Sequence, residues 1–208
     1  MSINLNGWRI FVQATKPNKN QTMKLLEKQK GLFAFVTKMH GEQVRKYTGE
    51  PYVNHCLQVA ELVSKFENDC VEIALCHDLF EDTKCDFTML HKELVRLGYE
   101  RKEAYGICTN VTELTDKFTH EDYPYLNRRQ RKINEAERLG KTSFKSQSVK
   151  YADLINNTES IVANDKKFAE VYLAEKDLIL QLMDKGDTEL FCNCLKSLQN
   201  ATHEIECV

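Results

Sequence analysis

The chain has 208 residues, of which 42% are hydrophobic and 29% are charged, and its formal net charge at pH 7 is -2. This composition is typical of a globular protein with one large core or two small ones, and it excludes a disordered chain. Without an excess of basic residues, we expect no binding to nucleic acid or to a membrane surface. The opening stretch MSINLNGWRIFVQATK lacks the apolar core of a signal peptide, and no apolar run approaches the ~20 residues of a membrane span. We therefore expect a cytoplasmic protein.

Helical periodicity dominates the chain. The stretch WRIFVQA, residues 8–14, is the one plausible strand. Beyond it, apolar residues recur at steps of three and four, which predicts helices. These patterns cover residues 53–66, 90–97, 104–118 and 168–183, with Gly98 placed to end the second of them. The three prolines fall between the predicted helices. The sequence thus predicts one all-α domain without internal repeats.

Eight cysteines are spread along the chain, and no CxxC pair occurs among them. Several lie within apolar helical patterns, so we interpret them as reduced core residues rather than disulfide or zinc-binding residues. A redox role for Cys192 and Cys194 is left open.

The stretch ALCHDLFEDT, residues 74–83, places two pairs of polar residues in an otherwise apolar segment: His77 with Asp78, and Glu81 with Asp82. Residues four apart stack on one face of a helix, so all four side chains are predicted to share one band. A buried imidazole among carboxylates needs a compensating cation, which a divalent metal ion supplies. The alternative is a half-exposed helix with a solvated acidic face.

Two further donors lie far from this stretch. His40 ends the apolar stretch GLFAFVTKMH, and Asp153 lies within VKYADLINN, with Asn157 one helical turn later. Together with His77 and Asp78 they make a complete ligand set for one metal ion with open positions. Taken singly, His40 could end a surface helix and Asp153 could be a charge on a helix face. His55, His91, His120 and His203 have no partners in the pattern and are interpreted as structural or surface residues.

The succession of GEPYVNH, ALCHDLFEDT and VKYADLINNTESI resembles the hydrolase domain of RelA/SpoT homologues. These enzymes of the HD superfamily remove the 3′-pyrophosphate of the alarmones ppGpp and pppGpp. The motifs occur in the family's order, and the nearest type is a stand-alone small alarmone hydrolase. The resemblance implies a single-domain HD helical bundle. It would comprise an N-terminal segment at 1–20, the hydrolase domain at 21–185, and a C-terminal helix and tail at 186–208 packed on the same domain.

The resemblance also implies roles for individual residues. The metal ligands would be His40, His77, Asp78 and Asp153, and the usual ion in the family is Mn²⁺. The acidic pair that handles the attacking water would be Glu81 and Asp82. The substrate-binding residues would be Arg45, Lys46, Asn157 and Ser160. Three positions depart from the family pattern: Cys56 stands in place of Pro, Leu154 in place of Arg and Asn156 in place of His. These departures leave the exact nucleotide open.

The chemistry can also be argued from the residues themselves. A divalent ion with open positions polarises a phosphoryl oxygen and lowers the pKa of a bound water. Glu81 and Asp82 lie one turn from His77 and Asp78, so one could accept a proton from that water while the other orients it. Alternatively, both could fix the ligand histidines. The sequence does not divide these roles.

A basic cluster, NRRQRK at 127–132, contains Arg128, Arg129, Arg131 and Lys132. Arginine forks suit phosphate oxygens, so the cluster could bind the 5′-phosphates of a nucleotide. It could equally be a solvated helix face.

The sequence therefore predicts a metal-dependent hydrolase that converts ppGpp or pppGpp into GDP or GTP and pyrophosphate. One alternative is an HD phosphohydrolase acting on another nucleotide, such as NADPH. Another is a regulator that binds a nucleotide without turnover. The expected partner is a small nucleotide, and the oligomeric state is left open.

Overall fold

The computed structural model describes residues 23–66 and 70–207. Regular structure in this part of the chain is helical, apart from one isolated antiparallel bridge between Val44 and Pro51. The prediction of an all-α fold is confirmed. The predicted strand at 8–14 and the predicted N-terminal segment at 1–20 lie outside the described residues.

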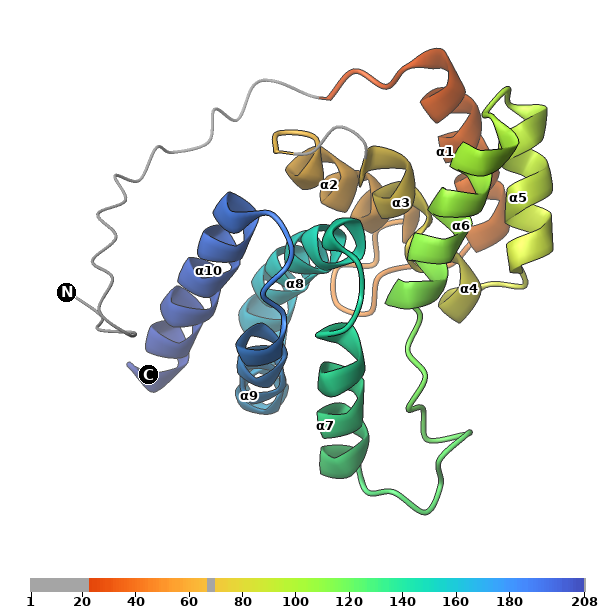
Figure 1. Cartoon of the computed structure of the whole chain (residues 1–208). Coiled ribbons are helices and arrows are strands. Elements are labelled where there is room, and N and C mark those ends of the chain that lie inside the picture. The colour runs from red at the N-terminus through yellow and green to blue at the C-terminus, as the bar shows by residue number, and fades with distance from the viewer. Residues whose placement is uncertain (1–22, 67–69, 208) are drawn as a thin grey trace.

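The first half of the chain forms one side of the molecule, with α1, α5 and α6 at its outer end (Figure 1). Helix α3 lies between this group and the second half, and it contacts α1, α2, α6 and α8. The helices of this half are α1 (Glu27–His40), α2 (Val53–Val63), α3 (Val71–Cys76), α4 (Leu79–Asp82), α5 (Phe87–Arg96) and α6 (Arg101–Leu114).

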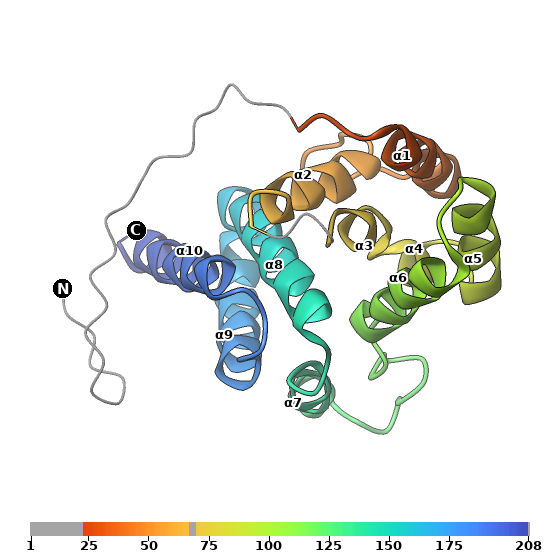
Figure 2. The same ribbon diagram turned by 45° about the horizontal axis from the view of Figure 1, so that its top comes forward.

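Helix α8 is the central element, and it packs against α2, α3 and α6 on one side and α9 and α10 on the other (Figure 2). The second half comprises α7 (Arg128–Leu139), α8 (Phe144–Asn164), α9 (Lys166–Leu182) and α10 (Thr188–Glu206). Because α8 has neighbours on several sides, most of its first half is buried. A side chain on α8 can therefore meet residues from both halves of the chain.

Local signals set several helix ends. Ser143 caps α8 by accepting a hydrogen bond from the backbone N–H of Ser146. Gly98 adopts a φ of 88° just after α5, a conformation that favours glycine. Between α9 and α10, Gly186 lies so close to α8 that a Cβ there would come within 2.5 Å of the Tyr151 ring. This glycine lets the connecting segment lie against α8.

Two details differ from the sequence-based prediction. The pattern at 104–118 predicted a helix that includes Phe118, but α6 ends at Leu114 and Thr115 is extended. The backbone N–H groups of Lys117 and Phe118 instead donate to the buried carboxylate of Glu135 on α7. The stretch 74–83 is also not one helix, because α3 ends at Cys76 and α4 begins at Leu79. His77 and Asp78 form the turn between them.

The buried cysteines behave as small apolar residues. Cys56, Cys76, Cys85, Cys108 and Cys194 are free thiols in the core. Burial raises the pKa of the Cys76 thiol well above its usual value, which suppresses the reactive thiolate. None of the helices formed by residues 23–66 and 70–207 combines the length and apolarity that a membrane span requires.

Candidate metal centre and active site

The turn between α3 and α4 presents His77 and Asp78 to the interior. The Nδ1 atom of His77 lies 2.7 Å from the carbonyl oxygen of Ala74. A carbonyl oxygen only accepts, so Nδ1 carries the proton and Nε2 of the neutral ring keeps its lone pair. That Nε2 lies 3.0 Å from Oδ2 of Asp78. The turn thus aims one nitrogen and one oxygen donor at the same point.

His55, on the first turns of α2, brings a second imidazole to this point. Its Nδ1 lies 2.7 Å from Oδ1 of Asn156 on α8, which fixes the tautomer as in His77. Its Nε2 lies 3.2 Å from Nε2 of His77 and 3.5 Å from Oδ2 of Asp78. The donor atoms of His55, His77 and Asp78 all lie within 4.8 Å of one another.

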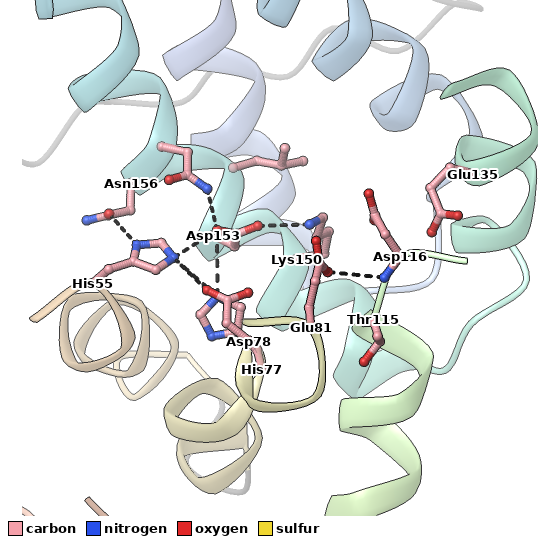
Figure 3. Close-up of polar contacts among 12 residues, drawn as sticks. His55, His77, Asp78, Glu81, Thr115, Asp116, Glu135, Lys150, Asp153 and Asn156 are labelled. Atoms are coloured by element: carbon pink, nitrogen blue, oxygen red, sulfur yellow. Dashed lines mark hydrogen bonds and ion pairs between the residues drawn. The ribbon is translucent and has the colours of Figure 1, made fainter. Parts of the chain in front are cut away.

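Helix α8 contributes the fourth donor, Asp153. Its Oδ1 lies 3.2 Å from Nε2 of His55 and 3.7 Å from Nε2 of His77. Figure 3 shows the carboxylates of Asp153 and Asp78 on the same side of the His55 ring, both facing its Nε2. Four donors from three separate segments therefore converge in a place where His55, His77 and Asp153 are almost fully buried.

The charges of the cluster reinforce one another. Burial alone would lower the pKa of His77, but the carboxylates of Asp78 and Asp153 outweigh it and hold that pKa well above its usual value. Conversely, burial would raise the pKa of Asp78, but the imidazoles of His77 and His55 hold it well below its usual range. The site therefore stabilises positive charge between its carboxylates.

This donor set fits a divalent cation. Two lone-pair nitrogens 3.2 Å apart repel each other unless a proton or a metal ion lies between them. Nitrogen ligands of an ion such as Zn²⁺ lie ~2.0–2.1 Å from it, so two ligands at a right angle are about 3 Å apart. Mixed imidazole and carboxylate donors are shared by several first-row metals, so the donor set alone does not select Mn²⁺.

His40, predicted as a ligand, lies beside this group and not within it. Its Nδ1 is 2.8 Å from Oε1 of Gln43, and its Nε2 is 3.9 Å from Sγ of Cys56. Its ring stacks on Tyr52, with the ring centroids 5.0 Å apart. In the described part of the chain, the structure brings His55 and not His40 to the His77–Asp78 pair.

Tyr52 connects His40 to the cluster, a link that the sequence analysis did not anticipate. Its hydroxyl donates to Oδ2 of Asp78 over 2.7 Å. The loop that carries it is held by a backbone hydrogen bond from Tyr52 to Gln43, next to the isolated bridge. His40 therefore supports Asp78 through the ring and hydroxyl of Tyr52.

The acidic pair of α4 divides between two environments. Glu81 points toward Asp116, whose backbone N–H donates to its carboxylate over 3.2 Å (Figure 3). Burial of the carboxyl group, together with the charge of Asp116, raises the pKa of Glu81 to about 7. Asp82 faces Tyr52 instead, and burial and the charge of Asp78 raise its pKa as well. A carboxyl group with a pKa near neutrality is suited to accept and release a proton.

The predicted substrate-binding residues lie along the adjoining loop and α8. Arg45 is buried and donates from Nη1 to Oδ1 of Asn157, whose Nδ2 in turn donates to Oδ1 of Asp153 over 2.6 Å. Lys46 is exposed, with its Nζ 4.7 Å from the centre of the Tyr47 ring. Ser160 is partly exposed and lies in the second half of α8. Asn157 thus contacts the cluster at Asp153, Arg45 reaches it through Asn157, and Lys46 faces solvent.

The basic cluster at 127–132 is distributed among different partners. Arg128 forms a two-pronged ion pair with Glu175 on α9. Arg131 donates to the carbonyl oxygen of Leu126, and Lys132 pairs with Asp116 over 3.1 Å. Three of the four basic side chains therefore hold α7 and its preceding loop in place.

Comparisons with known proteins agree with the motifs. A scan against protein-family models finds no match. The chain is 29% identical over 130 residues to the Drosophila melanogaster protein MESH1, a guanosine-3′,5′-bis(diphosphate) 3′-pyrophosphohydrolase. This match covers 60% of the chain and 64% of MESH1, less than two thirds of its length.

A solved structure gives the wider comparison. It belongs to a metazoan orthologue of SpoT that hydrolyses ppGpp, and it matches with a TM-score of 0.69. The match covers 90% of this chain and 98% of the other at 21% sequence identity. The chain has the fold of the SpoT orthologue. The predicted resemblance to a ppGpp hydrolase is confirmed by the sequence similarity to MESH1, and the predicted helical bundle is confirmed by the shared fold.

Proposed function

We propose that this chain is a metal-dependent 3′-pyrophosphohydrolase that converts ppGpp or pppGpp into GDP or GTP and pyrophosphate. The observation that carries the proposal is the convergence of His55, His77, Asp78 and Asp153. The carboxyl group of Glu81 lies beside this cluster (Figure 3). The sequence similarity to MESH1, itself named as such a hydrolase, supports the choice of substrate.

In this proposal His55, His77, Asp78 and Asp153 hold one divalent cation, with Mn²⁺ as the ion suggested by the family. When bound, the cation supplies Lewis acidity to a phosphate oxygen and to the attacking water. His55 replaces His40 in the ligand set, because its Nε2 faces the other donors. His40 keeps a supporting role through Tyr52.

Glu81 accepts the proton of the attacking water, and Asp82 orients that water. Two observations support this division. Glu81 has the carboxyl group whose pKa is raised to about 7, close to the optimum for a general base at neutral pH. Asp82 lies next to the proposed ligand Asp78, whose charge, after burial, raises the pKa of Asp82. Attack of the water oxygen on the 3′ α-phosphorus would transfer one proton to Glu81 and break the bond between that phosphorus and the ribose 3′ oxygen. Pyrophosphate then leaves, and the 3′ oxygen of GDP or GTP takes up a proton.

Arg45, Lys46, Asn157 and Ser160 bind the nucleotide in this proposal. Arg45 and Asn157 form a hydrogen-bonded pair next to Asp153, close to where the 3′-phosphates would meet the cation. Lys46 is exposed, donates a hydrogen bond to the neutral hydroxyl of Tyr47 and lies 4.0 Å from the carboxylate of Asp165, so its charge is accessible to a phosphate. Burying part of Lys46 against substrate phosphates would strengthen that interaction.

Incubation of the purified chain with Mn²⁺ and a panel of nucleotides tests the proposal. The panel contains ppGpp, pppGpp and NADPH, and the products are separated by chromatography. We expect pyrophosphate and GDP from ppGpp, and no activity after treatment with EDTA. If NADPH is consumed while ppGpp persists, the proposed substrate is wrong, but the proposed metal centre still stands.

The matched control is the double variant Glu81→Gln/Asp82→Asn, which keeps the shape of both side chains. We expect it to bind ppGpp and fail to hydrolyse it. The wild-type chain and the double variant could instead bind the nucleotide equally, with Mn²⁺ present, and both fail to hydrolyse it. That result would support a regulator that binds a nucleotide without turnover.

A further inference from the structure

Lys150 is a largely buried charged residue beside the site that the sequence analysis did not assign. It lies on α8, one turn before Asp153, and its Nζ is 2.9 Å from Oδ2 of Asp153. Its side chain is only 19% exposed. Figure 3 shows Lys150 between Asp153 on one side and Glu81 and Asp116 on the other.

The two oxygens of Asp153 have different partners. Oδ2 accepts from Lys150, which precedes it on α8, and Oδ1 accepts from Nδ2 of Asn157, one turn after it. Only Oδ1 approaches His55 and His77. With Oδ2 engaged by an ammonium group, the carboxylate cannot turn to offer both oxygens to a cation. The contacts of Lys150 therefore favour ligation through Oδ1 alone.

The opposite side of Lys150 faces two further carboxylates. The charges of Asp116 and Glu81 both act on its ammonium group, after that of Asp153. Asp116 also accepts from Lys132 over 3.1 Å and donates its backbone N–H to Glu81. Lys150 thus stands between the predicted ligand Asp153 and the predicted proton acceptor Glu81, and its charge attracts both.

We propose that Lys150 is a positioning residue of the metal centre, which holds Asp153 so that Oδ1 alone faces the cation and keeps Glu81 beside it. This inference rests on the proposed function, because it concerns the same site. Lys150 acts through Asp153 and Glu81 and does not itself contact the reacting atoms.

The test compares Lys150→Met with Lys132→Met. Lys132 is a matched control because it is joined to the same network through Asp116 but does not contact Asp153. Mn²⁺ affinity is measured by calorimetric titration of the chain without nucleotide, after circular dichroism has verified the fold. Partners that orient a metal ligand are typically worth about 10- to 100-fold in metal affinity. We expect a loss of this size in Lys150→Met and a change below about threefold in Lys132→Met.

Two further measurements distinguish positioning from general stabilisation. Lys150→Arg keeps the charge and the donor, and we expect it to recover most of the Mn²⁺ affinity. At saturating Mn²⁺, Lys150→Met should lower kcat for ppGpp more than it changes KM, because Lys150 contacts the donors and not the substrate. If Lys150→Met does not fold, Lys150→Gln replaces it, with the same loss expected.

Unchanged Mn²⁺ affinity in a folded Lys150→Met or Lys150→Gln chain would overturn the inference. So would equal losses in Lys150→Met and Lys132→Met, since they would indicate an effect of net charge. Failure of the wild-type chain to bind Mn²⁺ would instead contradict the proposed function. The two ideas can therefore fail separately.

Discussion

The Nε2 atoms of His55 and His40 face different partners, and this predicts different effects on metal binding. His55→Gln removes a proposed ligand, so Mn²⁺ affinity should fall by more than the roughly 10- to 100-fold typical of supporting residues. His40→Gln removes only the ring that stacks on Tyr52. We therefore expect its loss of Mn²⁺ affinity to be at most roughly 100-fold, as for other supporting residues. Calorimetric titration of both variants measures the difference. A larger loss in His40→Gln would restore His40 to the ligand set.

The sequence identified three of the four converging donors and missed His55 for a definite reason. His77, Asp78 and Asp153 stand in short motifs whose residue types indicate metal chemistry. His55 and His40 both end or begin helices near the same loop, and spacing along the chain does not reveal which ring turns inward. The direction of His55 is fixed by Asn156, a residue 101 positions away. Such a long-range hydrogen bond has no local signal.

Glu81 and Asp82 should differ in the pH dependence that they confer. Glu81 is active as a carboxylate, so hydrolysis should decline as the pH falls through its pKa, which is raised to about 7. A bound cation lowers that pKa, so about 7 is the upper limit for the acid limb. Glu81→Gln should reduce kcat by roughly 10²- to 10⁴-fold and abolish the limb. Asp82→Asn should also reduce kcat, but its pH profile should retain the acid limb.

Profiles of kcat against pH at saturating Mn²⁺ measure this difference. If the acid limb survives in Glu81→Gln and vanishes in Asp82→Asn, Asp82 is the proton acceptor and Glu81 orients the water.

Lys176 is a buried ammonium group whose hydrogen-bond partners are neutral. It donates to Thr158 and Ser197, from α8 and α10, and burial lowers its pKa below the usual value. At a pH below the pKa of Lys176 in the folded chain, Lys176 is protonated in both the folded and the unfolded chain. The folded chain then carries the full free-energy cost of burying the charged ammonium group. As the pH rises toward ~10.4, the folded state loses its proton first and this cost disappears.

Lys176→Met should therefore raise the free energy of unfolding at pH 7 by on the order of 1 kcal/mol. The gain should shrink as the pH approaches ~10.4. Urea unfolding at neutral and alkaline pH measures both values. A gain that grows with pH would contradict the assigned direction of the shift.

Among the elements, α7 fixes the segment that follows α6. Glu135 is buried on α7 and accepts hydrogen bonds from the backbone N–H groups of Lys117 and Phe118 and from Arg138. The neighbouring Asp116 contacts Glu81. Glu135→Ala leaves buried donors without an acceptor, so it should cost about 1–3 kcal/mol and lower kcat through Glu81.

Glu175→Ala is the matched control, because Glu175 pairs with Arg128 at the edge of α7, away from Asp116. An exposed pair is worth about 0–1 kcal/mol, so this variant should change stability and kcat little. Thermal unfolding and steady-state kinetics of both variants provide the comparison. Equal effects would exclude a specific role for Glu135.

The same region shows where periodicity loses its predictive power. Leu114 and Phe118 are four residues apart and fit one helical face, which predicted a helix through both. The helix ends at Leu114, and the backbone N–H groups beyond Thr115 find side-chain acceptors, Glu81 for Asp116 and Glu135 for Lys117 and Phe118. By contrast, the predicted end of α5 near Gly98 is confirmed, since a glycine with positive φ is a local signal. Ends set by local residues were predictable, and ends set by other helices were not.

At the scale of the whole molecule, the proposed ligands join three segments: α2, the α3–α4 turn and α8. A ligand that binds only the folded chain stabilises it by RT ln(1 + [L]/Kd), about 2.7 kcal/mol at a concentration of 100 Kd. For a chain of 150–250 residues, 1 kcal/mol corresponds to roughly 2–4 °C in Tm. Mn²⁺ at 100 Kd should therefore raise Tm by roughly 5–11 °C.

The control for this shift is His77→Asn, which removes one donor from the turn between α3 and α4. Its Tm should respond much less to the same Mn²⁺ concentration, because an incomplete ligand set no longer joins the three segments. Differential scanning calorimetry of both chains, with and without EDTA, measures the shift. An equal rise in Tm for both chains would mean that Mn²⁺ stabilises the protein from another site, and the four converging donors would lose their assigned role.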